Sequence, residues 1–193
     1  MKFARTLIAS IAAGLLATSA MALTEPEYKM SKDKISADYK AAKTNCDTLK
    51  DNAKDICVKE AKGAENVAKA ELDAQHKPSD KATNKARMAR ADADYDVAKE
   101  KCDDLKGNAK DVCVKDAKAA HTTAKENAKV AKAAAKPADS AAEKGAQVAE
   151  ARKDASAEKN EANYKAAKER CDAMSGDAKS KCVDEAKRMY GQS

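Results

Sequence analysis

Six cysteines, arranged as three pairs of identical spacing, constrain the fold of this 193-residue chain more than any other feature. Ten residues separate the members of each pair, and each pair lies in a copy of one segment that starts with a tyrosine seven residues before the first cysteine. Three matching segments predict a repeat architecture in which each copy is one supersecondary unit. The pairs are Cys46 with Cys57, Cys102 with Cys113, and Cys171 with Cys182.

The residues between the cysteines of each pair predict a tight turn between two helices. In the second copy, Gly107 suits the left-handed position after a helix, and Asn108 is a preferred cap for the next helix. Each cysteine pair therefore straddles a predicted helical hairpin symmetrically. Gly176 and Asp177 have the same two roles in the third copy. The first copy has Asp51 and Asn52 instead, so its turn is expected to differ slightly.

Small and apolar residues recur at steps of three and four on both sides of each turn, which is the spacing of a coiled-coil seam. Most seam residues after the turn are alanines, so the two backbones can approach closely. A disulfide needs Cα atoms within about 4.4 to 6.8 Å, and we therefore expect three disulfides, each within one copy. In the first copy the seam is Ile35, Tyr39, Ala42, Cys46 and Leu49, followed by Cys57, Ala61, Ala64 and Ala68.

The sequence thus predicts an all-α fold of three disulfide-stapled antiparallel helical hairpins, with six helices. Pro78 and Pro137 mark the boundaries between units, because proline breaks a helix interior. Whether the hairpins form one bundle or an extended array is left open. The expected segments are a signal peptide at 1–22 and hairpin units at 23–77, 78–136 and 137–193.

The first 22 residues have the pattern of a secretory signal peptide. Lys2 and Arg5 precede an apolar run, and Ala20-Met21-Ala22 fits a cleavage site, so the mature chain is expected to start at Leu23. The run is too short to span a bilayer, and no membrane span is expected after cleavage. Structural disulfides are typical of oxidising compartments. The expected location is the bacterial periplasm, with secretion to the outside left open.

No residue pattern predicts a catalytic, cofactor-binding or metal-binding site, and we expect the protein not to be an enzyme. Cysteines that bind zinc usually have about two to four residues between them, not ten. His76 and His121 are expected to be solvated surface residues, and the scattered carboxylates single out no acid–base pair. The tyrosines of the repeats are expected to plug the hairpins. They are Tyr39, Tyr95 and Tyr164.

The charges predict a solvated helical surface. The chain has 38 basic and 32 acidic residues, and the two signs alternate every few positions. Nucleic acid is therefore not an expected partner. The expected partner is another envelope protein, or a cell-wall or lipopolysaccharide polymer that could contact lysine-rich stretches such as residues 131–136.

The composition resembles the helical middle region of TolA-type cell-envelope proteins and the stress-protection proteins called hydrophilins. The motif Cys-Asp-x-Leu-x-Gly-Asn-Ala-Lys-Asp-x-Cys-Val, which starts at Cys102, is similar to one in small exported proteobacterial proteins labelled TolA-like. The resemblance assigns no functional residue. It implies a non-enzymatic exported structural or interaction protein of the cell envelope. Hydrophilin-like stress protection is the alternative, and polyanion or metal binding is the weaker one.

Reduction of the disulfides is expected to lower the melting temperature substantially while leaving part of the helix. Closing each loop stabilises the fold by about 3 kcal/mol in the chain-entropy model, whereas alanine and charge pairs four residues apart support helix without packing. Replacing Cys102 and Cys113 together by serine is expected to weaken the middle hairpin most directly. Circular dichroism melting with and without reductant measures the effect, and a melting curve unchanged by reduction would contradict it.

Overall fold

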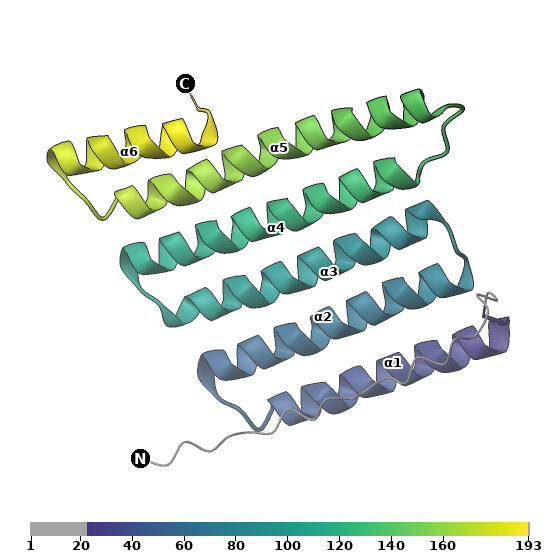
Figure 1. Ribbon diagram of the computed structural model, residues 1–193. Helices are drawn as coiled ribbons and strands as arrows, with labels where there is room; N and C mark the ends of the chain where they lie inside the picture. The colour runs from purple at the N-terminus through teal and green to yellow at the C-terminus, as the bar shows by residue number, and fades with distance from the viewer. Residues whose placement is uncertain (1–22, 193) are drawn as a thin grey trace, which may run out of the picture.

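The computed structural model describes residues 23–192, and the elements in this range are helices. Figure 1 shows the long helices lying side by side, each antiparallel to the next. The predicted all-α fold with six helices is confirmed, while the predicted signal peptide lies outside the described residues. The helices are α1 (Glu25–Cys46), α2 (Asp51–His76), α3 (Asp80–Lys101), α4 (Gly107–Ala135), α5 (Ala141–Cys171) and α6 (Gly176–Tyr190), with a short 3-10 helix η1 (Cys102–Asp104) after α3.

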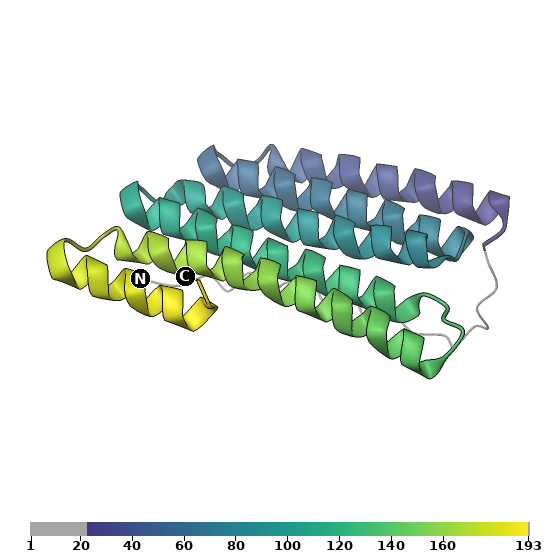
Figure 2. The same ribbon diagram turned by 90° about the horizontal axis from the view of Figure 1, so that it is seen from above.

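The helices form one extended layer and do not close into a bundle (Figures 1 and 2). Throughout the described range, the extensive contacts join each helix to the helices just before and after it in the chain. The contacts between successive units, α2 with α3 and α4 with α5, are the most extensive of all. The hairpins are therefore parts of one continuous array.

The three predicted disulfides are confirmed. Their Cα–Cα distances are 5.5 Å for Cys46–Cys57, 5.6 Å for Cys102–Cys113 and 5.7 Å for Cys171–Cys182. The first cysteine of each pair is almost completely buried. All three bridges lie beside the turns that line one edge of the layer, on the left in Figure 1. We call this edge the disulfide edge.

The buried core consists almost entirely of small side chains. Within residues 23–192, the buried apolar residues besides the three cysteines are eight alanines and Leu72. The predicted seam of the first hairpin lies between α1 and α2, where Cys46 and Cys57 are joined and the other seam residues except Leu49 line a shared space. Helix α1 ends at Cys46, so Leu49 lies in the turn and is 42% exposed. The buried alanines are Ala70, Ala91, Ala117, Ala119, Ala128, Ala155, Ala166 and Ala186.

Gly107 and Gly176 have the predicted left-handed conformation, and Asp51 shares it with a φ of +50°, so the expected difference of the first turn is wrong. The predicted side-chain caps after these residues are also wrong. Gly107 has a φ of +55° and is itself the first residue of α4, which begins without a side-chain cap. Asn108 therefore lies inside the helix, where its Nδ2 donates a hydrogen bond to the Glu169 carbonyl of α5 at 3.1 Å. Asn52 donates in the same way to the Glu100 carbonyl of α3, also at 3.1 Å. Both asparagines thus join one unit to the next.

The helices that begin at the opposite edge of the layer do have side-chain caps. Thr24, Ser79 and Ser140 precede α1, α3 and α5, and each accepts a hydrogen bond from a backbone N–H of the first turn. Pro78 and Pro137 lie in the connections at this edge. Such caps are worth about 1 kcal/mol each, so local sequence fixes where these helices start.

The backbones of two units approach closely at Gly63 of α2. A Cβ atom added at Gly63 would lie 2.8 Å from the Cβ of Ala93 on α3. Atoms that close overlap, so only glycine fits at this crossing. By contrast, Gly145 of α5 has no atom within 4 Å of its Cβ direction.

Replacing Gly63 by alanine is expected to destabilise the fold by about 1–3 kcal/mol, because the new methyl group forces α2 and α3 apart. The matched control is Gly145→Ala, which adds the same methyl group at an open helical position and is expected to stabilise by up to about 1 kcal/mol. Urea unfolding of both variants measures the difference. Effects of the same sign would contradict the close packing of α2 against α3.

Candidate interaction surfaces

The disulfide edge presents the same turn three times. In each copy the α-helix ends at the first cysteine or one residue before it. The carbonyl of this cysteine accepts a hydrogen bond from the backbone N–H three residues later, at 2.9–3.0 Å. A residue with positive φ then starts the next helix. Because the sequences are equivalent, the three turns have one backbone shape. The positive-φ residues are Asp51, Gly107 and Gly176.

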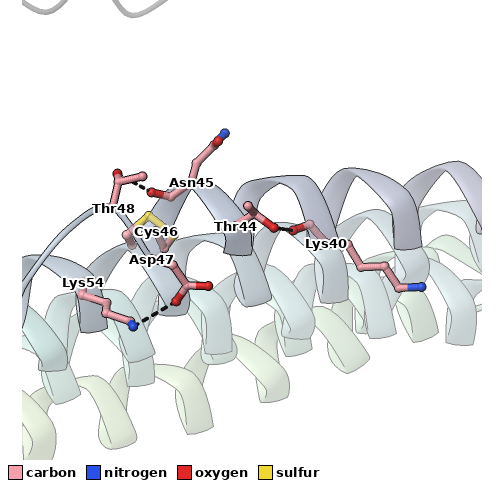
Figure 3. Close-up of a disulfide and its surroundings, with 8 residues drawn as sticks. Lys40, Thr44, Asn45, Cys46, Asp47, Thr48 and Lys54 are labelled. Carbon is pink, nitrogen blue, oxygen red and sulfur yellow. Dashed lines mark hydrogen bonds and ion pairs between the residues drawn. A yellow bond between two sulfur atoms is a disulfide. The ribbon is translucent and has the colours of Figure 1, made fainter.

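An ion pair spans each of these turns. The distances are 2.9 Å for Lys54–Asp47, 2.8 Å for Lys110–Asp103 and 2.8 Å for Lys179–Asp172. Figure 3 shows the first pair beside its disulfide. In each turn, the hydrogen bond from the lysine holds the pKa of the aspartate below its ordinary value of 3.8. These exposed ion pairs link the two ends of each turn and contribute up to about 1 kcal/mol each.

One large apolar side chain projects from each turn at the position three residues after the first cysteine. These side chains are 42%, 41% and 47% exposed. Two helices separate successive members, or roughly 16–20 Å at ordinary interaxial distances. The disulfide edge thus presents a row of three exposed apolar side chains, each in a turn that also has an ion pair. The residues are Leu49, Leu105 and Met174.

A furrow runs along the contact between α2 and α3. Its larger part has a volume of about 480 Å³ and reaches Ala124 of α4, and its smaller part extends to Gly63. The two parts share Glu71, Arg90 and Asp94. The floor of the furrow is mostly alanine. The floor residues are Ala64, Val67, Ala68, Ala74, Ala86, Ala91, Ala93 and Ala124.

Charged side chains form the rim of this furrow. Arg90 and Glu71 pair across it, and Arg87 and Asp94 lie on the α3 side. Arg87 is exposed, and so is Arg90. An apolar floor between charged rims is the surface that a partner helix with one apolar face recognises. The furrow is therefore a candidate contact surface.

The two histidines are packed against tyrosines, so their predicted exposure is wrong. His76 stacks on Tyr28 with ring centroids 4.4 Å apart, and His121 stacks on Tyr95 at 4.6 Å. Only 10% of the His76 side chain and 17% of the His121 side chain are exposed. The antiparallel pairing of helices brings these rings together from distant parts of the sequence.

Polar groups surround the His76 ring at the start of the array. Its Nδ1 lies 2.9 Å from the Leu23 carbonyl, and its Nε2 lies 3.2 Å from Glu25. The Tyr28 hydroxyl donates to Asp73 at 2.9 Å, which raises the pKa of that tyrosine. The beginning of the described chain is thus tied to the far end of α2.

The predicted site residues fall into two groups. All six cysteines are in disulfides, and Tyr39, Tyr95 and Tyr164 are half-buried at their hairpins.

Within residues 23–192, no group of three or more His, Cys, Asp or Glu side chains is placed to hold a metal ion. No helix in this range combines the length and hydropathy needed to cross a membrane. The furrow was missed because its rim residues come from two units.

Comparison of the chain with protein-family models, with curated proteins and with solved structures found no match.

Replacing Lys110 by glutamine is expected to raise the pKa of Asp103 towards 3.8, because the lysine is the main cause of its lowered value. A carboxyl whose pKa is lowered in the folded state stabilises that state at pH values above its ordinary pKa. In the native protein, the free energy that each turn aspartate contributes is therefore lost as the pH falls below 3.8 and through the lowered pKa. Carboxyl-carbon NMR titration measures the change. Asp47 and Asp172 are internal controls in the same sample, and an unchanged Asp103 would contradict the role of the pair.

Proposed function

We propose that the protein is a non-enzymatic structural or interaction protein of the bacterial cell envelope, exported to the periplasm. Three disulfides suit an oxidising compartment, and the first 22 residues fit an export signal. The proposed partner is another envelope protein. A cell-wall or lipopolysaccharide polymer is the second class of partner.

The furrow is the observation that carries this proposal. In a single layer each helix buries only its two flanks, so both faces of the array remain available for contact. Extended arrays of helices commonly use such faces to bind partners. The alanine floor and the Arg87, Arg90 and Glu71 rim suit a protein helix with an apolar face and charged edges.

The proposal is tested by photo-crosslinking in intact cells. A benzoylphenylalanine at Arg87, on the rim of the furrow, is expected to crosslink to one envelope protein. The matched control places the same group at Lys81, an exposed residue of the same helix that lies outside the furrow. Identical adducts from both positions, or no adduct from Arg87, would contradict an interaction role for this surface.

Stress protection is the second candidate, and the small core favours it. Only one large aliphatic side chain is buried in the described range, and the mean hydropathy of the chain is −0.76. A chain that protects others by bulk hydration does not need its tertiary fold. The double variant Cys102→Ser, Cys113→Ser therefore separates the two functions. Cells that lack the protein, cells with the native protein and cells with the double variant are dried and their survival is compared. Survival that falls without the protein but is the same with the variant as with the native chain would favour stress protection.

A further inference from the structure

The two interfaces between units use the same polar contacts. Asn52 of the first unit donates to the Glu100 carbonyl, and Asn108 of the second unit donates to the Glu169 carbonyl. Both asparagines lie five residues before the second cysteine of their unit, and both acceptors lie two residues before the first cysteine of the next. One unit thus caps the end of a helix in the following unit.

Two ion pairs accompany each asparagine. Lys59 lies 4.0 Å from Glu100, and Lys115 lies 3.9 Å from Glu169. In the second ion pair the acid lies on the earlier helix and the base on the later one. Glu60 lies 3.3 Å from Lys101, and Asp116 pairs with Arg170 at the equivalent place. We call the side of α2 or α4 that carries the asparagine, the lysine and the acid the donor flank. The facing side of α3 or α5, which carries the glutamate and the following basic residue, is the acceptor flank. Each interface pairs one donor flank with one acceptor flank.

A small residue completes the donor flank. Gly63 lies six residues after the second cysteine of the first unit and touches Ala93. The equivalent residue of the second unit is Ala119, which is 5% exposed. Close approach of the backbones at this point is thus a shared requirement of both interfaces.

The third unit departs from this pattern at three of the four positions on its donor flank. Asp177 replaces the asparagine, Asp184 replaces the lysine and Arg188 replaces the small residue, while the acid is kept as Glu185. All three replacements are exposed on α6. A carboxylate cannot donate to a carbonyl, two added acids repel the negative end of a helix, and an arginine prevents close approach.

The other end of the array is altered as well. Helix α1 has Thr44 and Asn45 where α3 and α5 have a glutamate followed by lysine or arginine. The Thr48 hydroxyl donates to the Asn45 carbonyl at 2.7 Å, as Figure 3 shows. The carbonyl equivalent to those of Glu100 and Glu169 is that of Thr44, which accepts a hydrogen bond from the backbone N–H of Asp47 at 3.2 Å. The last turn of α1 thus makes its hydrogen bonds within its own unit.

We propose that α6 is a terminating cap, in which Asp177, Asp184 and Arg188 stop the array at three units by preventing a second copy of the chain from adding head to tail. Terminal repeats with a polar outer flank keep repeat proteins from extending. The proposal does not depend on what the furrow binds. Its consequence is that each molecule is a closed array rather than a link in a filament.

The test restores the donor and acceptor flanks. A variant with Asp177→Asn, Asp184→Lys and Arg188→Gly on α6, and Thr44→Glu and Asn45→Lys on α1, is expected to self-associate about a hundredfold more tightly than the native chain in sedimentation equilibrium. The changes on α6 alone and on α1 alone are the matched controls, each expected to gain less. All these residues are exposed, and circular dichroism verifies the fold. Native head-to-tail association, or no gain in the full variant, would overturn the proposal.

A reciprocal exchange gives a second readout that does not require association. Asn52→Asp with Lys59→Asp transfers the cap residues of α6 into an internal interface, and it is expected to lower the melting temperature. Asp177→Asn with Asp184→Lys makes the reverse change on the outer flank. It removes only the exposed ion pair of Asp184 with Lys187 and the acidic residue of the first turn of α6, so it is expected to lower the melting temperature of the monomer much less. Equal losses from both exchanges would mean that α6 is no different from an internal helix, and the proposal would fail.

Discussion

Close approach of helices with small facing side chains is the interaction on which the rest of this structure depends. Disulfide-bonded Cα atoms lie 5.5–5.7 Å apart across the three hairpins. Alanine and glycine at the interfaces let the backbones come together, as the contact of Gly63 with Ala93 illustrates. The same residues offer little apolar surface to bury. Disulfides, turn ion pairs and helix caps therefore supply stability that a larger core would otherwise provide.

This balance explains the shape of the molecule. A helix with large apolar residues on several sides would be covered by more than two neighbours, but these helices have small residues on two flanks and polar residues elsewhere. Each unit buries its small residues only by packing against the next unit. The asparagine and ion-pair contacts set the position of one unit relative to the next. An extended layer results, in which successive units hold one another in register.

The same arrangement creates the surfaces available for function. The row of Leu49, Leu105 and Met174 exists because the three turns have one shape and lie on one edge. The furrow exists because two units meet over an alanine floor. The array thus presents broad polar surfaces with few large buried side chains.

Residue types and their spacing predict the local features: the helices, the glycine turns, the helix breaks near the prolines and the pairing of Cys46 with Cys57 and of its two counterparts. These features depend on contacts between residues that are near one another in the chain. The arrangement of the hairpins depends on contacts between units. The tertiary structure paired Asn108 with the Glu169 carbonyl, stacked His76 on Tyr28 and formed the furrow. Those contacts join residues from different helices or units, and helical periodicity defines which face a residue occupies but not which helix will cover it.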